Sequence, residues 1–367
     1  MTETGLNPAE LEAAILFEQR GSLGVVVLNR PKAVNALTAG MCELMLAQLQ
    51  SWAVDDAIDQ VLVYGNGDRG LCAGGDIVAI YRDALDQQAG GGNNSSAAFW
   101  ATEYRLNSLI SRYPKPYIAF MDGLVLGGGV GISAHGSHRL VTERTRCGMP
   151  ETTIGFVPDV GGTFLLSRAP GETGTHAALT GSHLAAADVL FLGMADEFVP
   201  SERLSELALA LESEPVDEVL PRFVAAAPAS ALQQEQQLID EAYAAQSVEQ
   251  ILSSLRSVTT EDQETAAGYA QTIESKSPTA LKVALASLRR SRELSSLEEA
   301  LDQEYRVGLR LLAGHDMAEG IRAQVIDKDR NPQWQPASLA EVSDSDVESY
   351  FVRNGEHELG LAAAVQS

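Results

Sequence analysis

The sequence predicts an α/β protein. Two short apolar runs, residues 61–64 and 116–120, each lead into a glycine turn, as buried strands of a sheet do. Stretches with apolar residues at helical spacing lie between and after these runs. With 367 residues, of which 45% are hydrophobic, the chain is long enough for one large core or two modest ones.

A hairpin and a helix are predicted as the first elements. Residues 15–17 and 24–28 are apolar and are joined near Arg20-Gly21-Ser22, so we expect them to pair as antiparallel strands. Thr38 is expected to cap a helix, because its hydroxyl oxygen is suited to accept from an unpaired N–H of the first turn. Apolar side chains follow at helical spacing and are expected to pack in the core, namely Met41, Leu44, Met45, Leu49 and Trp52.

Glycine is concentrated just after the second predicted strand. Gly127, Gly128 and Gly129 carry no side chain that would keep a ligand from the backbone, and the small and apolar residues 130–134 are suited to open a buried helix. A strand, a glycine turn and a helix start leave several N–H groups unpaired and pointing the same way. Such a place favours negative charge.

These glycines have three interpretations. Close packing of a helix on a strand is the plainest. A dinucleotide site fits poorly, because the spacing does not match G-x-G-x-x-G and no acidic ribose ligand follows a second strand. The third is an oxyanion hole, which needs a second N–H donor and a reactive side chain nearby.

Both of these further components occur in the chain. Residues 71–77 form a second glycine turn, placed after the apolar run 61–64, where it can present another N–H. Glu151 and Asp159 lie eight positions apart, and each follows a proline, which disfavours a helical surface for the pair. Loops often carry catalytic groups, although a single loop carboxylate is more commonly just solvated.

The charge and the cysteines limit the classes of partner. A formal charge of −24 argues against nucleic acid or an anionic membrane, since both are polyanions and no basic run offsets the repulsion. Three widely spaced cysteines, Cys42, Cys72 and Cys147, fit reduced thiols in the cytoplasm. The first residues resemble no signal or transit peptide, and no apolar run has the length of a membrane span. The six histidines form no metal-binding pair, so no metal is expected.

Several motifs together resemble the crotonase (enoyl-CoA hydratase/isomerase) superfamily and, within it, the 3-hydroxyisobutyryl-CoA hydrolase branch. They are CAGGD at 72–76, GLVLGGGVG at 123–131, MPETTIGFVPDVGG at 149–162 and GMADEFV at 193–199. The resemblance resumes in the last third of the chain and covers most of it between about residues 16 and 351. Its later segments are 277–282, 297–300, 304–306, 314–316, 327–329 and 332–334.

The resemblance implies a division of the chain. Residues 1–200 would form a crotonase-like ββα spiral core with the acyl-CoA site. Residues 201–276, rich in Glu, Gln and Ala, read as a helical insertion. Residues 277–352 would form a C-terminal helical region that completes the coenzyme A site, and 353–367 a tail. Such proteins can be homo-oligomers, and coenzyme A would be part of the substrate, with no separate cofactor.

The resemblance also implies roles for single residues. The catalytic set would be Glu151, Asp159 and the N–H groups of Gly75 and Gly128. The acyl group would lie against Glu103, Gly127 and Gly74. The coenzyme A moiety would lie against Lys32, Ala73, Ile77 and Lys328. From the residues alone, a plain surface lysine is the favoured interpretation of Lys32, and Lys328 could pair with Asp327 or Asp329.

The reaction follows from one missing carboxylate. Hydratases of the superfamily use two glutamates around one water; one matches Glu151, but the other position is Gly131 here. Because a positioned acid–base group contributes about 10²–10⁴-fold, efficient hydration is not expected. Thioester hydrolysis needs only a stabilised oxyanion and one carboxylate, and it is the expected activity, on a short branched 3-hydroxyacyl-CoA such as 3-hydroxyisobutyryl-CoA. The alternatives are a hydratase or isomerase that uses Glu151 alone and a non-catalytic acyl-CoA binding protein.

Overall fold

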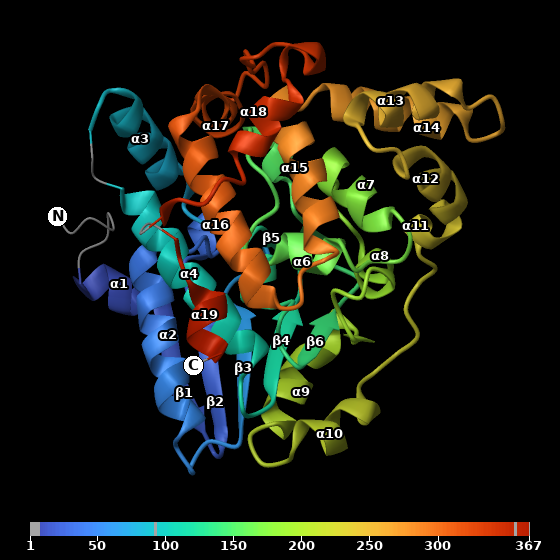
Figure 1. Ribbon diagram of the computed structural model, residues 1–367. Helices are drawn as coiled ribbons and strands as arrows, with labels where there is room; N and C mark the ends of the chain where they lie inside the picture. Colours follow the sequence, from blue (N-terminus) through green and yellow to red (C-terminus); the bar gives the residue numbers. More distant parts are fainter. Residues whose placement is uncertain (1–7, 92–93, 356–357, 367) are drawn as a thin grey trace. The chain divides into compact units, whose positions relative to one another are not determined.

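The computed structural model describes residues 8–91, 94–355 and 358–366 (Figure 1). The chain forms two compact units, and each is assembled from separate segments. The first contains Met1–Asp76, Ala98–Gly148 and His183–Ser230. The second contains Ile77–Ala97, Met149–Ser182 and Ala231–Ser367.

A six-stranded sheet organises the first unit, and its strand order is β1-β2-β3-β4-β6-β8. The predicted hairpin is confirmed, because β1 and β2 pair antiparallel with Ile15 opposite Leu28. Every later pair in the sheet is parallel. The strands are β1 (Ile15–Arg20), β2 (Leu23–Leu28), β3 (Gln60–Gly65), β4 (Tyr117–Met121), β6 (His138–Val141) and β8 (Glu197–Phe198).

Helices cover both faces of β2, which explains why its sequence is apolar throughout. Gly24 faces α2 (Ala39–Ala53), and a Cβ built on it would lie 2.9 Å from the Trp52 ring. Thr38 caps α2 as predicted, since its Oγ1 accepts from the Met41 N–H at 3.3 Å. The alternate residues of β2 pack in one buried cluster with α9 (Leu204–Ala210), α10 (Val216–Val219) and the segment after them. That cluster includes Leu23, Val25, Val27, Leu62, Ile118, Phe120, Leu140, Leu207 and Phe223.

Short elements complete this unit around the glycine turns. The strand β5 (Leu124–Leu126) precedes α5 (Gly128–Gly131), and β7 (Arg146–Gly148) follows it in the chain. These two strands pair as a two-stranded parallel sheet. The buried helix expected after the glycines is therefore only one turn long. The remaining elements are α1 (Pro8–Ala14), η1 (Pro31–Ala33), α8 (Ala186–Phe191), η3 (Ser201–Arg203) and η4 (Leu220–Arg222).

The described part of the second unit consists of helices and loops. They are α3 (Ile77–Gln88), η2 (Glu151–Ile154), α6 (Gly162–Leu166), α7 (Thr173–Thr180), α11 (Ala231–Gln234), α12 (Gln236–Tyr243), α13 (Val248–Ser257), α14 (Gln263–Glu274), α15 (Pro278–Ser291), α16 (Leu297–Ala313), α17 (His315–Ile321), the π-helical turn η5 (Arg322–Ile326), η6 (Leu339–Glu341), α18 (Asp344–Ser349) and α19 (Leu361–Gln366). The helix α4 (Ser95–Ser111) begins in this unit and continues in the first.

An aromatic cluster joins three of these helices. His176 of α7 lies 2.9 Å from the Tyr243 hydroxyl of α12, and its ring centroid is 4.4 Å from that of Tyr269 in α14. Burial lowers the pKa of His176 to about 4, because the charged ring would lose its hydration. This histidine is a neutral part of the core at physiological pH.

The predicted segments and the compact units run differently along the chain. Residues 201–276 are helical as expected, but 201–230 belong to the unit with the sheet. Conversely, 149–182 belong to the unit with the C-terminal helices. The expected tail contains α19, whose Leu361 N–H donates to Asp302 at 2.8 Å. The boundaries of the four predicted segments stay a prediction.

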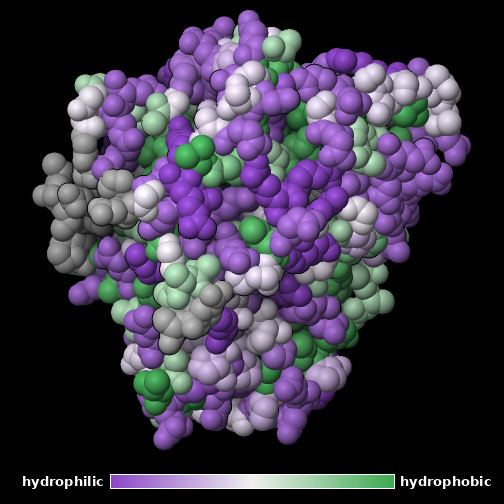
Figure 2. All heavy atoms as spheres, in the orientation of Figure 1, coloured by the Kyte–Doolittle hydropathy of each residue, from purple (hydrophilic) through white to green (hydrophobic). Residues whose placement is uncertain are grey.

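Hydrophilic side chains dominate the face shown in Figure 2, with apolar residues scattered between them. This agrees with the excess of acidic over basic residues in the sequence. In the ranges described above, no helix combines the length and the apolar character of a bilayer span.

Gln60 joins the sheet to the segment that covers it, and its loss should destabilise the first unit. The side chain is 3% exposed and binds the carbonyls of Leu211 and Glu214 and the N–H of Val216 at 2.8–2.9 Å. Gln60→Ala should lower the free energy of unfolding by about 2–4 kcal/mol, because buried backbone groups lose their partners. Urea denaturation measures this. The exposed Gln19→Ala is the control, with an expected change of about 0.5 kcal/mol or less; equal losses would contradict the role of Gln60.

Candidate active site

A parallel bridge between Leu37 and Gly75 orients the first predicted N–H donor. The Leu37 N–H donates to the Gly74 carbonyl at 2.8 Å, and the Asp76 N–H donates to the Leu37 carbonyl at 2.8 Å. Since these two bonds use the groups on either side of Gly75, the Gly75 N–H points away from Leu37. Among the described residues, no backbone carbonyl accepts from it.

The second donor lies at the start of α5. Gly127 has φ 49° and ψ −116°, a conformation that favours glycine, and its N–H donates to the Gly148 carbonyl at 3.2 Å. Gly128 opens the helix, so its N–H has no partner within the helix. A Cβ built on Gly128 would lie 3.4 Å from the Gly75 nitrogen, and one built on Gly74 would lie 3.8 Å from the Gly128 nitrogen. The two turns therefore bring their N–H groups together.

Glu103 lies beside these two donors. It extends from α4, is 2% exposed, and its Oε1 is 2.5 Å from the point where a Cβ on Gly128 would be. Burial, and to a lesser extent the Glu103 charge, raise the pKa of Cys72 to about 12, so that thiol stays protonated. Within the first unit, the structure thus brings Glu103, Gly74, Gly75, Gly127 and Gly128 to one place.

Two residues that the sequence analysis did not single out hold the first turn. Arg30 lies 3.2 Å from the Asp76 carboxylate and also donates to the Ala36 carbonyl. Asn35 is 1% exposed, has φ 57°, and donates to the carbonyls of Asn66 and Gly70. Their signal in the sequence was weak, because an arginine before a proline and an asparagine near a helix start are common surface features.

The predicted carboxylates belong to the second unit. Glu151 opens η2 after Pro150 and is 7% exposed; its carbonyl accepts from the Phe156 N–H at 3.0 Å. Asp159 is 6% exposed and begins a tight turn, in which the Gly162 N–H donates to the Asp159 carbonyl at 2.6 Å. Both are loop carboxylates held away from bulk water, unlike the solvated acids that are usual in loops. Their catalytic roles stay predictions.

The predicted coenzyme A contacts are dispersed over the two units. Lys32 is exposed on η1, and the Ala73 N–H donates to the Val34 carbonyl at 2.9 Å. Ile77 is the first residue of α3 in the second unit. Lys328 is exposed at φ 59°, and Asp327 and Asp329 each pair with Arg322 at 2.7 Å. Both aspartates are thus bound by Arg322, and the two interpretations of Lys328 stay predictions.

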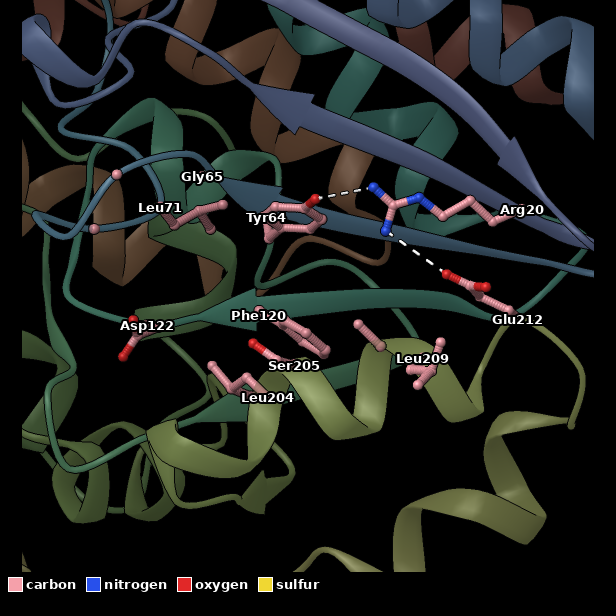
Figure 3. Close-up of a pocket in the computed structure, with 13 residues that line it drawn as sticks. Arg20, Tyr64, Gly65, Leu71, Phe120, Asp122, Leu204, Ser205, Leu209 and Glu212 are labelled. Carbon is pink, nitrogen blue, oxygen red and sulfur yellow. Dashed lines mark hydrogen bonds and ion pairs between the residues drawn. The ribbon is translucent and has the colours of Figure 1, made fainter.

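A pocket of about 430 Å³ in the first unit lies elsewhere, between α9 and the sheet (Figure 3). Tyr64 and Phe120 form its aromatic wall, and Arg20 closes one end by pairing with Glu212 at 3.8 Å. None of the predicted site residues lines it.

Comparisons with known proteins agree with the resemblance of the motifs. The family described as enoyl-CoA hydratase/isomerase matches residues 23–351. A 3-hydroxyisobutyryl-CoA hydrolase, mitochondrial, of Danio rerio is 40% identical over 359 residues, which are 95% of this chain and 91% of that protein. The Homo sapiens protein of the same name is 37% identical over 356 residues, with 94% and 90% covered.

Two solved structures are also similar over nearly their whole length. A carnitinyl-CoA dehydratase from Mycobacterium thermoresistibile is 47% identical with a TM-score of 0.89, covering 94% of this chain and 98% of that one. An enoyl-CoA hydratase from Rhodobacter sphaeroides 2.4.1 is 37% identical with a TM-score of 0.86, covering 94% and 99%. The expected crotonase-like fold is confirmed. On its motifs, its fold and these matches, the chain belongs to the enoyl-CoA hydratase/isomerase family.

Proposed function

We propose that the protein hydrolyses a short branched 3-hydroxyacyl-CoA thioester, with 3-hydroxyisobutyryl-CoA as substrate and 3-hydroxyisobutyrate and coenzyme A as products. The observation that carries the proposal is the match, over at least nine-tenths of their length, to relatives named 3-hydroxyisobutyryl-CoA hydrolase. The reaction would be a step of valine catabolism. Coenzyme A enters as part of the substrate, and the proposed chemistry requires no further cofactor.

The paired glycine turns supply the electrostatic part of this reaction. When water or a carboxylate adds to the thioester carbonyl, negative charge develops on its oxygen, and the N–H groups of Gly75 and Gly128 would receive it. One such donor contributes about 10²–10³-fold to the rate. Gly74 and Gly127 would let the carbonyl approach the backbone, because neither has a side chain.

Glu151 is the proposed reacting carboxylate. It would either take a proton from the attacking water or attack the carbonyl itself and form an anhydride that water then opens. In both routes one water is consumed, the carbon–sulfur bond breaks, and coenzyme A leaves as the thiolate. Asp159 would hydrogen-bond the 3-hydroxyl of the acyl group, or orient the water and the leaving thiolate, and Glu103 would line the acyl pocket.

A hydratase activity is the alternative, since two similar solved structures are titled as a dehydratase and a hydratase. The position of the second glutamate of superfamily hydratases is Gly131, a buried residue of α5 that has no side chain to give or take a proton. Loss of one positioned acid–base group reduces the rate by about 10²–10⁴-fold. This magnitude favours hydrolysis over hydration as the main activity.

Location and assembly are also proposals. A cytoplasmic location is supported by three buried cysteines that are thiols in the structure, whereas the relatives are named mitochondrial. We further propose a homo-oligomer, on the resemblance alone. Subcellular fractionation of the native host and analytical ultracentrifugation would test the two proposals separately.

Free-thiol release from 3-hydroxyisobutyryl-CoA, measured beside the loss of enoyl absorbance from crotonyl-CoA, tests the proposed reaction. The first should proceed and the second should be slower by orders of magnitude. Glu151→Gln should reduce thiol release by about 10²-fold or more without unfolding the protein. Glu293→Gln, the same change at an exposed glutamate, should keep full activity. Near wild-type turnover of the Glu151 variant would reject it as the reacting carboxylate.

Asp159 is expected to recognise the substrate hydroxyl. A site built to bind a hydroxyl strongly disfavours an analogue that lacks it. Asp159→Ala should therefore lose more kcat/KM on 3-hydroxyisobutyryl-CoA than on isobutyryl-CoA, by about tenfold or more. If both substrates lose activity equally, Asp159 acts on the water or the thiolate and does not select the hydroxyl.

Gly128 should not tolerate a side chain. In Gly128→Ala the added methyl would displace the Glu103 carboxylate and crowd the Gly75 N–H, so thiol release should fall by about 10²-fold. The control is Gly268→Ala in α14, where a Cβ meets nothing within 4 Å. That change should keep the activity and raise stability by about 0.5–1 kcal/mol. Equal activity of the two variants would exclude the Gly128 turn from the site.

A further inference from the structure

We propose that Glu304 of α16 is a positioning residue, whose carboxylate fixes the turn that carries Asp159. The inference deepens the proposed function, on which the role of Asp159 rests. Glu304 lies 145 positions after Asp159 in the sequence (304 − 159), and it is 1% exposed. All groups involved belong to the second unit.

Three hydrogen bonds join Glu304 to this turn. Its Oε2 accepts from the Gly161 N–H at 2.7 Å, and its Oε1 accepts from the Thr163 N–H at 2.9 Å and from the Thr163 hydroxyl at 2.5 Å. Gly161 and Thr163 flank Gly162, where α6 begins. The carboxylate therefore holds the end of the Asp159 turn and the first N–H groups of the helix at once.

The turn needs such support because its backbone is strained. Val160 has φ 51° and Gly161 has φ 81°, so both central residues of the turn from Asp159 to Gly162 are left-handed. This pattern is a type I′ turn, which normally takes Asn, Asp or Gly at its first central position. A β-branched valine there is unfavourable by about 1–3 kcal/mol and persists only when its surroundings hold it. The bonds to Glu304 supply that restraint directly after Val160.

A chain of neutral side chains orients the carboxylate. Gln303 donates to the Ser291 hydroxyl at 3.4 Å, and the Ser291 hydroxyl donates to that of Thr163 at 2.9 Å. The Thr163 hydroxyl then donates to Glu304. Each of these groups donates its hydrogen bond to the next group on the way to Glu304, so all the hydrogen bonds of the network point in one direction.

Asp159 acts on Glu304 through its charge. The pKa of Glu304 is raised to about 8, mainly by burial and also by the charge of Asp159, against the lowering effect of the bonds from Thr163 and Gly161. The neighbours Thr163, Ser291 and Gln303 are neutral, and Arg168 donates to the Ser291 carbonyl. Below about pH 8 the Glu304 carboxyl is therefore mainly the neutral acid, whose oxygens still accept hydrogen bonds from the turn, and it ionises as the pH rises.

The sign of the stability effect follows from the raised pKa. Between the ordinary glutamate pKa near 4.3 and about 8, the folded protein binds one proton more than the unfolded chain. The free energy of unfolding should therefore fall as the pH rises through this range. In Glu304→Gln this component should be absent, and its unfolding midpoint should vary less with pH between 5 and 8.

The experiment compares Glu304→Gln, Asp159→Asn and the double variant. Glutamine keeps one acceptor oxygen but replaces the other by an NH₂ group, which cannot accept from the turn. Glu304→Gln should lower kcat for 3-hydroxyisobutyryl-CoA by about tenfold or more, since a misplacement of about 1 Å costs about 10²-fold, with KM little changed. In the Asp159→Asn background, Glu304→Gln should have little further effect, because the two act as a unit.

Glu299→Gln is the control on the same helix. Glu299 is partly exposed and accepts from Ser295 near the start of α16, a position where glutamine serves as well. It should leave kcat and the variation of stability between pH 5 and 8 unchanged, because the bonds from Ser295 lower the pKa of Glu299 and place its titration below this range. If Glu304→Gln does not fold, Thr163→Val removes the hydroxyl bonds to Glu304 and from Ser291 but keeps the Thr163 N–H bond to Glu304. It should lower kcat in the same direction by a smaller factor.

Two outcomes separate this inference from the proposed function. If the wild-type protein releases no thiol, the proposed function fails. Hydrogen exchange of the peptide covering 159–166 then still tests Glu304, and it should be faster in Glu304→Gln than in Glu299→Gln. Equal exchange in the two variants, or kcat losses that add fully with Asp159→Asn, would overturn the positioning role.

Discussion

The bridge between Leu37 and Gly75 is the contact on which the first unit's part of the site depends. It uses the Gly74 carbonyl and the Asp76 N–H, and so it aims the one N–H between them away from the protein backbone. Arg30 and Asn35 then fix the two segments that form the bridge. An oxyanion donor contributes most when it is already oriented before the charge develops. The backbone hydrogen bonds of this bridge, together with the Arg30–Asp76 ion pair beside it, provide that orientation.

The second unit meets a similar requirement by a different route. Its loop carboxylate Asp159 is held by a turn whose backbone is unfavourable in isolation. A buried glutamate on a distant helix accepts three hydrogen bonds from that turn and the helix after it. Burial of Glu304 costs solvation free energy, which its hydrogen bonds offset only in part, as its raised pKa shows. Stability is thus given up to fix the shape of a loop for which a catalytic role is proposed.

The excess of acidic groups constrains how an anionic coenzyme is held. A net charge of −24 repels polyanions at long range, so local donors and single lysines must provide any attraction. Arg322 binds Asp327 and Asp329, and Lys328 lies between them on an exposed left-handed turn. The single charge of the arginine offsets only part of the charge of the lysine's acidic neighbours. The predicted coenzyme A contact at Lys328 depends on this local balance and not on the charge of the whole protein.

The local elements were determined by the sequence alone. The hairpin, the Thr38 cap, the strands before both glycine turns and the helices of 201–276 follow from periodicity, capping chemistry and glycine, which act over a few residues. The family followed from four motifs, because the sequence combines these two glycine turns with a segment that carries Glu151 and Asp159. Only the tertiary structure decided that each unit is assembled from separate segments of the chain. It also decided three contacts: Leu37 orients Gly75, Glu103 lies beside Gly128, and Glu304 holds the Asp159 turn. These contacts join residues from 25 to 143 positions apart (128 − 103 and 304 − 161). No local pattern encodes them, because a buried glutamate and a surface glutamate on a helix look alike until the partner segments are in place.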